Sequence, residues 1–284
     1  MHTAYENKSW SPWWGTYHIP EGLAGCWEVG PCTIWVASRP NEWRIARFQL
    51  NDAYVDAAEV RTSLEMSEMM AFIEAKGEAV SLHRFGFRVP GDEIYVRPRL
   101  ADRAVVVQPE MPLHILPREE VTLYISTPLW VQFEAGSPRR VLQEFPLYRP
   151  SDTWFGESTI HGELCYAGRT AARLRLQDLT VRPYRVITPV RVKNRAQDGL
   201  LLNRIQVLVQ YLSIFEATNG HLWTQMVTVE RERSGDFAAM KIGVGAPAEA
   251  GETTRLESPR RAIESNLIFR AFGGLFKDKS IWTS

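Results

Sequence analysis

Residues 32–46 read CTIWVASRPNEWRIA, and this stretch decides the expected fold. Side chains alternate in character along residues 32–37 and again along residues 43–46, which is the twofold period of a β-strand. A turn sequence, SRPN at residues 38–41, separates the two runs. Alternation on both sides of a Pro and Asn turn predicts an antiparallel hairpin. Just before it, Trp27 and Val29 alternate with Glu28, which predicts a third strand that ends at the Gly-Pro pair of residues 30–31.

The same rhythm recurs along most of the chain, in short runs that Gly and Pro residues separate. Clear examples are residues 121–125, 160–166, 205–209 and 238–242. Many short strands at fairly regular spacing favour a sandwich or a barrel. We therefore expect a mainly β protein, made of two packed antiparallel β-sandwich or barrel-like units with one short helix.

The expected helix lies where the β rhythm breaks. Met66, Met69, Met70 and Ile73 recur at helical spacing, and Gly77 offers a stop signal. These residues predict a helix over residues 62–76. We expect its methionine stripe to pack against the protein rather than to bind a ligand.

A Pro-rich stretch over residues 109–117 predicts the boundary between the two units. The N-terminal β unit would cover residues 1–108, with a Trp-rich arm and the helix, and the C-terminal β-sandwich unit residues 109–245. Residues 246–284 would form a linker and a docked C-terminal tail, because residues 247–257 have a linker composition. For the tail a strand is preferred over a helix. The sequence leaves open whether the two units are independent domains.

The composition of the chain limits which partners and which cellular compartment are expected. The 33 basic residues balance the 33 acidic residues, for a formal net charge of zero. This balance argues against a nucleic-acid partner and leaves little self-repulsion to oppose self-association. The three cysteines cannot build a disulfide framework, and residues 1–14 lack the pattern of a secretory signal. The longest apolar run, residues 207–215, is too short for a transmembrane segment. We expect a soluble, cytoplasmic protein.

The search for catalytic motifs leaves one candidate. The sequence contains no phosphate-binding glycine loop, no Gly-x-Ser-x-Gly and no His-Glu-x-x-His. Residues 161–165 read HGELC, and on a strand His161, Glu163 and Cys165 would share one face. Imidazole, carboxylate and thiolate are all zinc ligands, so a metal-dependent hydrolase centred on these residues is one hypothesis. The other interpretation is a solvent-facing strand with ordinary polar residues. No cofactor and no other metal ligand set is expected.

Two further groups of residues have both a functional and a structural interpretation. Cys26 and Cys32 could approach each other across a turn, but we expect buried, small apolar residues. Arginines cluster between Arg169 and Arg195 and would suit phosphate or carboxylate recognition. A solvated, salt-bridged surface is the expected role of these arginines.

Six short segments resemble a known family, and together they bracket nearly the whole chain. They are residues 27–31 (WEVGP), 34–36 (IWV), 42–46 (EWRIA), 188–195 (TPVRVKNR), 222–224 (LWT) and 270–276 (RAFGGLF). In these segments the chain resembles the domain-of-unknown-function 432 family. The helix segment is the part that fits this family least. The resemblance implies no particular activity, and it suggests a membrane-protein partner, because some relatives are associated with small mechanosensitive channels.

The tryptophan content is the most unusual feature of the composition, because the chain has ten tryptophans and most of them lie towards the N-terminus. Such aromatics either fill a β core or form a contact surface. The leading hypothesis is a non-enzymatic protein-interaction or scaffolding protein that binds a protein partner or a second copy. Its candidate contact residues are Trp10, Trp13, Trp14, Phe272 and Phe276.

The first alternative is a small-ligand or carbohydrate-binding module, with an aromatic platform beside polar groups such as Glu42 and Arg44. The second alternative is the metal-dependent hydrolase centred on His161, Glu163 and Cys165.

Overall fold

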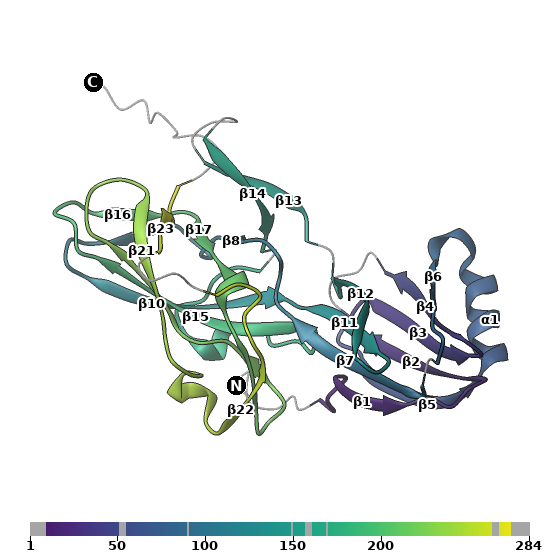
Figure 1. The fold of residues 1–284 in the computed structure, drawn as a ribbon. Helices are drawn as coiled ribbons and strands as arrows, with labels where there is room; N and C mark the ends of the chain where they lie inside the picture. Colours follow the sequence, from purple (N-terminus) through teal and green to yellow (C-terminus); the bar gives the residue numbers. More distant parts are fainter. Residues whose placement is uncertain are drawn as a thin grey trace.

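The computed structural model describes residues 10–50, 55–89, 91–148, 150–156, 161–168, 170–262 and 267–273. Over these residues the chain is mostly β, with several sheets and a single α-helix (Figure 1). The expectation of a mainly β protein with packed β units and one short helix is confirmed.

The stretch that opens the sequence argument forms the centre of a five-stranded sheet with the order β5-β2-β3-β4-β6. The strands are β2 (Leu23–Val29), β3 (Cys32–Arg39), β4 (Glu42–Gln49), β5 (Ala58–Glu65) and β6 (Ser81–Gly86). β3 and β4 form the expected hairpin, with Arg39 opposite Glu42 at the turn. β2 is the expected third strand and ends at Val29.

Alternation along β3 directs its side chains into two different cores. Ile34 and Val36 pack into the main hydrophobic core, whereas Trp35 and Ala37 pack on the opposite face with Met69 of helix α1 (Met66–Lys76). The helix therefore covers the outer face of the five-stranded sheet (Figure 1).

The helix prediction was wrong at its start and for one methionine. Residues 62–65 belong to β5, where Leu64 pairs with Ala24 of β2, and sheet pairing overrides the local helical pattern there. The helix begins at Met66, and the Glu65 backbone N–H donates to Glu68 Oε1 at 3.2 Å. Met69 is buried, but Met70 is 48% exposed, so Met70 does not belong to the packed stripe.

A four-stranded sheet packs on the inner face of the five-stranded sheet and completes a sandwich. Its order is β1-β7-β11-β12, with β1 (Gly15–His18), β7 (Glu93–Arg99), β11 (Trp130–Ala135) and β12 (Arg140–Pro146). Trp27 meets Phe133 edge-on across the interior, with ring centroids 5.8 Å apart. β11 pairs with β7, so this sheet takes strands from both sides of the boundary expected near residues 108–109. That boundary stays a prediction.

The second half is organised around one long central strand, β15 (Arg185–Asn194). β15 pairs antiparallel with β10 (Glu120–Pro128) and parallel with β20 (Val227–Arg231). The same sheet contains β18 (Ile214–Ala217), β19 (Leu222–Trp223), β21 (Phe237–Ile242), β22 (Thr253–Glu257) and β23 (Leu267–Arg270). Most pairs are antiparallel, as expected, and the parallel pairs arise where the chain returns after a longer excursion.

Smaller sheets flank this large one. One sheet has the order β13-β14-β8-β17, and β9 pairs with β16 in another. Their bounds are β8 (Val105–Val107), β9 (Leu113–Ile115), β13 (Asp152–Gly156), β14 (Gly162–Ala167), β16 (Leu200–Leu202) and β17 (Ile205–Val207).

The structure settles the interpretation of two C-terminal segments. Thr253–Glu257 is strand β22, so this part of residues 247–257 is not a linker. Leu267–Arg270 is strand β23, which confirms the preference for a strand, and Phe272 then bridges to Ile205. Within the described parts of the chain, no helix has the length and apolar character needed to cross a membrane.

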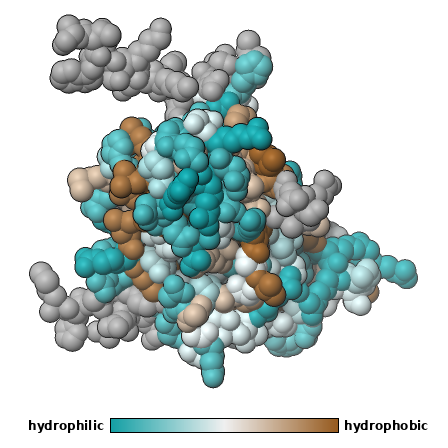
Figure 2. Space-filling model, turned by 90° about the vertical axis from the view of Figure 1, so that its left-hand side faces the viewer, coloured by the Kyte–Doolittle hydropathy of each residue, from teal (hydrophilic) through white to brown (hydrophobic). Residues whose placement is uncertain are grey.

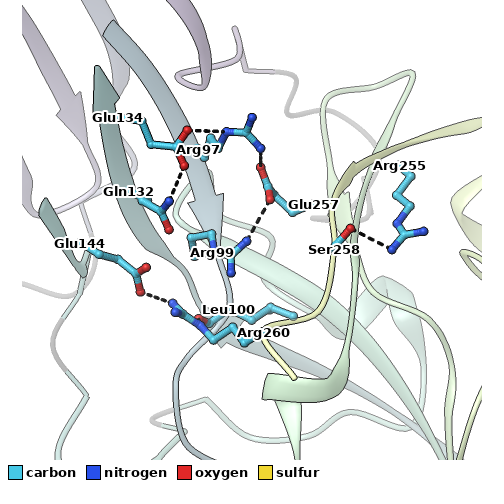
Figure 3. Close-up of polar contacts among 10 residues, drawn as sticks. All are labelled: Arg97, Arg99, Leu100, Gln132, Glu134, Glu144, Arg255, Glu257, Ser258 and Arg260. Carbon is cyan, nitrogen blue, oxygen red and sulfur yellow. Dashed lines mark hydrogen bonds and ion pairs between the residues drawn. The ribbon is translucent and has the colours of Figure 1, made fainter. Parts of the chain in front are cut away.

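Ion pairs join β22 to the sandwich (Figure 3). The buried Glu257 carboxylate accepts hydrogen bonds from Arg97 Nη1 at 2.9 Å and from Arg99 Nη1 at 3.0 Å, both on β7. Three residues further, Arg260 Nε donates to the Leu100 carbonyl at 2.5 Å, and its guanidinium pairs with Glu144 of β12. The segment around β22 is therefore fixed to β7 and β12 by charged hydrogen bonds.

Candidate functional site

A cavity of about 810 Å³ lies where β23, β17 and the β13–β14 hairpin come together. Figure 1 shows these strands as neighbours in the upper part of the second half. The residues that line the cavity come from β13, β14, β17, β21, β23 and the short 3₁₀ turn Val209–Tyr211, together with His161, Leu208 and Arg261. Short-range sequence patterns would not associate these elements.

The cavity exists because two neighbouring segments separate. Phe272 bridges antiparallel to Ile205, and the Gln206 backbone N–H donates to the Ala271 carbonyl at 2.9 Å. Continued pairing would place Leu208 opposite Phe269. Instead, the chain after β17 enters the 3₁₀ turn, and Leu208 and Phe269 both line the cavity.

One wall of the cavity holds a carboxylate that an amide fixes in place. Gln206 is only 2% exposed, and its Nε2 donates to Glu163 Oε2 at 3.0 Å and to Cys165 Sγ at 3.4 Å. Burial, followed by the negative charge of Glu163, raises the pKa of the Cys165 thiol to about 11. Cys165 is therefore a neutral thiol at physiological pH, and Glu163 offers hydrogen-bond acceptors to the cavity.

The expected grouping of His161, Glu163 and Cys165 forms only in part. Glu163 and Cys165 meet at Gln206, whereas His161 precedes β14 and lines the same cavity together with Glu163. Cys165 is buried and does not line the cavity. Among the described residues, no three His, Cys, Asp or Glu side chains lie close enough together to hold a metal ion.

A second acceptor, which sequence reasoning did not single out, is the side-chain carbonyl of Gln210. Gln210 is 8% exposed, lines the cavity, and its Oε1 has no hydrogen-bond partner within the described part of the chain. Leaving a buried carbonyl unsatisfied costs about 1–3 kcal/mol, so a donor from a ligand would be stabilising here. The only sequence signal was that Gln210 interrupts the apolar run of residues 207–215.

The rest of the cavity combines aromatic rings with guanidinium groups. Phe155 is buried, whereas Phe237 is 55% exposed. The Arg270 guanidinium lies 4.8 Å from the centre of the Phe237 ring and donates to Asp236 Oδ2 at 3.0 Å. Arg261 adds a further positive charge. The cavity therefore presents apolar surface, acceptor oxygens and basic groups close together.

The aromatic residues expected to form a contact surface lie mostly inside the molecule. Trp13, Trp14 and Phe272 are buried, and Trp13 Nε1 donates to the Pro183 carbonyl at 2.9 Å. Trp10 is half-buried and packs against His221, with ring centroids 5.4 Å apart. The N-terminal arm therefore docks on this chain's own second half. Phe276 lies outside the described residues.

Among the residues that the structure describes, no exposed aromatic platform lies beside Glu42 and Arg44. The Glu42 carboxylate accepts from Arg44 Nε at 2.6 Å and from Arg84 Nη2 at 2.6 Å, so its charge is already paired. Trp43 between them is fully buried and contributes to the main core. The sequence places Trp43 between Glu42 and Arg44, as the expected platform requires. Alternation along the strand, however, directs the Trp43 side chain to the inner face of the sheet, away from these two charged residues.

The arginine-rich segment is largely an ion-paired surface, as expected. The described pairs are Arg173 with Glu110, Arg175 with Asp178, Arg182 with Asp56, Arg191 and Lys193 with Glu120, and Arg195 with Glu230. Arg185 differs, because it is buried and donates to Ser126 Oγ at 2.8 Å and to Thr170 Oγ1 at 3.0 Å. It fixes β15 to β10 and does not present its charge on the surface.

Cys26 and Cys32 lie on opposite faces of the five-stranded sheet. Cys32 belongs to the main core and Cys26 to the cluster under α1. Both are buried, and burial raises the pKa of each thiol to about 12. They are small core residues, which is the interpretation preferred from the sequence.

Comparison with known proteins gives one match. A family model described as "Protein of unknown function (DUF432)" matches residues 13–277, nearly the whole chain. Neither the comparison with curated proteins nor the comparison with solved structures gives a match.

Proposed function

We propose, for a chain that belongs to the DUF432 family of proteins of unknown function, a non-enzymatic role as an interaction protein. Its binding site is the cavity between β14, β17 and β23, and its ligand carries hydrogen-bond donors. The observation that carries this proposal is Gln210, which lines the cavity and whose buried side-chain carbonyl has no hydrogen-bond partner among the described residues.

The size of the cavity supports binding, and its lining is more polar than that of a typical ligand site. Ligand sites are typically concave, about 300–1,000 Å³ in volume, and mostly apolar with a few fixed polar groups. Here the polar group that is held in place is the Glu163 carboxylate, whose Oε2 accepts a hydrogen bond from Gln206 Nε2 at 3.0 Å, and the Gln210 carbonyl adds a buried acceptor. Preorganised acceptors of this kind favour a ligand with N–H or O–H groups, because less order has to be created on binding.

A binding role accounts for the cavity better than hydrolysis does. A nucleophilic or metal-binding cysteine must be a thiolate, and the pKa of Cys165 is raised to about 11. The thiol also points into the protein, where it accepts a hydrogen bond from Gln206. Glu163 lacks a second carboxylate that could share acid and base roles, since Glu163 is the only acidic side chain among the described residues that line the cavity.

The face of the molecule drawn in Figure 2 supports recognition within a cavity rather than through a broad apolar patch. On the face drawn in Figure 2, hydrophobic residues form separate groups around a hydrophilic centre. Large obligate interfaces usually show contiguous apolar patches instead. The three buried cysteines are not joined in disulfides, which supports the cytoplasm as the compartment in which the protein works.

The test is a thermal-shift screen with a library of small amines, amides and alcohols, because a ligand that binds the folded state raises the melting temperature. Gln210→Leu removes the carbonyl at nearly constant volume. Gln143→Leu is the matched control, since Gln143 also has an unpartnered buried Oε1 but lies in β12. We expect shifts that Gln210→Leu abolishes and Gln143→Leu preserves. A library without hits, or hits that Gln210→Leu leaves unchanged, would overturn the proposal.

A further inference from the structure

β23 is the last strand of the large sheet, and among the described residues no strand lies beside its outer edge. Its four residues, Leu267–Arg270, all line the cavity. Consecutive residues of a strand point to opposite faces of the sheet, so a cavity that touches all four runs along the edge of the strand. Edge strands present backbone N–H and C=O groups that can pair with another chain.

The hydrogen-bond pattern shows which backbone groups face the cavity. The Ala271 N–H donates to the Asp236 carbonyl at 2.8 Å, and the register then places Phe269 opposite Ala238 of β21. Because hydrogen-bonded pairs alternate along an antiparallel ladder, Phe269 also bonds towards β21. The backbone groups of Ile268 and Arg270 therefore point away from β21, towards the cavity.

The opposite side of the cavity is the chain that leaves β17. If this segment stayed extended, it would continue to pair with β23. Instead, it enters the 3₁₀ helix Val209–Tyr211. The sheet thus has an open seam that begins at the bridge between Ile205 and Phe272. Two residues with acceptor oxygens line this seam, Glu163 and Gln210, and the Oε1 of Gln210 is itself buried.

We infer that the seam accepts an extended peptide segment of a partner protein, which adds to the edge of β23 as a strand and donates hydrogen bonds to Glu163 and Gln210. This inference rests on the proposed function and specifies its ligand. Strand addition obtains affinity from backbone hydrogen bonds and specificity from alternate side chains. Here the alternate side chains are a neutral donor such as asparagine towards the acceptors, because Arg261 and Arg270 also line the cavity, and an apolar residue against Leu208 and Phe269.

The probe is a fluorescein-labelled pentapeptide amide of alternating valine and asparagine, measured by fluorescence anisotropy with the full chain. Two versions carry backbone N-methyl groups, one on each set of alternate amides. N-methylation removes donors but keeps every side chain. We expect the parent peptide to bind, and at least one N-methylated version to bind more than tenfold more weakly.

The protein variants are Ile268→Pro and Ile268→Ala. Ile268 is 69% exposed, so neither change opens the core. Proline removes the N–H that points into the seam and disfavours pairing there, whereas alanine keeps the backbone. We expect Ile268→Pro to weaken binding at least tenfold more than Ile268→Ala does, because only proline removes the backbone N–H. Circular dichroism and melting temperature establish that both variants are folded.

The outcomes separate this inference from the proposed function. Equal binding of the parent and both N-methylated peptides, with loss in Gln210→Leu, overturns strand addition but leaves the cavity as the binding site. An absence of peptide binding, with fragments that still depend on Gln210, also overturns strand addition alone. Peptide binding that appears only after removal of residues 274–284 would make this chain's own tail the occupant. Dimerisation of the chain that Ile268→Pro abolishes would mean that a second copy occupies the seam. Either result overturns the inference of a separate partner.

Discussion

Burial decides the chemistry of the individual polar residues in this protein. The three thiols have pKa values raised to about 11 or 12, chiefly because removal from water penalises the thiolate. The same principle explains why burial lowers the pKa of Arg185, whose hydrogen-bond acceptors among the described residues are the neutral oxygens of Ser126 and Thr170, to about 10. Residue types alone could not predict these states, since each depends on what the fold places around the side chain.

At this scale we predict that Cys165 is almost inert towards thiol-specific reagents in the native protein. At pH 8 the solution lies about three units below its pKa, so roughly one thiol in a thousand is ionised, and burial slows access further. The rate should rise about tenfold per pH unit between pH 7 and 9 and become fast in guanidinium chloride. Mass spectrometry of the protein after increasing times with maleimide measures the rate at which Cys165 is labelled. Rapid native labelling of Cys165 at pH 7 would contradict the prediction.

Elements with a strong local pattern could be predicted from the sequence, whereas their ends could not. The β3–β4 hairpin follows from alternation around the turn at residues 38–41, and the strand interpretation of residues 267–270 also holds. The helix was placed four residues too early, because Leu64 and Glu65 pair with β2. A local pattern does not contain the partner strand, so it cannot fix such a boundary.

At the scale of elements, α1 offers a matched pair of substitutions. Met69 is buried against the outer face of the five-stranded sheet, whereas Met70 beside it is 48% exposed. Met69→Ala should lower the free energy of unfolding by about 2–4 kcal/mol through lost packing and a residual cavity. Met70→Ala should change it by less than about 0.5 kcal/mol. Urea unfolding measures both, and equal effects would mean that α1 does not pack through Met69.

The arrangement of the whole molecule depends on contacts between segments far apart in sequence. The chain leaves one sheet at the end of β10 and enters another at β11, with only Leu129 between them. Alternation along residues 121–125 indicates a strand, but it cannot show that the strand that follows belongs to a different sheet. The candidate site has the same origin, because Gln210, Glu163 and β23 meet only after folding. Its histidine and carboxylate were named from sequence, whereas its open seam was not.

Glu257 provides the test at the scale of the whole molecule, because its carboxylate joins β22 of the second half to β7 of the sandwich (Figure 3). Its side chain is 6% exposed, and its partners Arg97 and Arg99 are 37% and 19% exposed. Breaking a fully buried pair costs about 3–5 kcal/mol. Because water still reaches both arginines, we expect Glu257→Gln to lower the free energy of unfolding by about 2–3 kcal/mol.

The nearby control is Ser258→Ala, which removes only the hydrogen bond that Ser258 Oγ accepts from Arg255 at the exposed surface. It should cost less than about 0.5 kcal/mol. Hydrogen exchange then distinguishes local from long-range effects. If Glu257 joins the two halves, Glu257→Gln should speed amide exchange in both β22 and β7, since each loses a partner held by the same carboxylate. Faster exchange in β22 alone would mean that β7 is held by the sandwich without this ion pair.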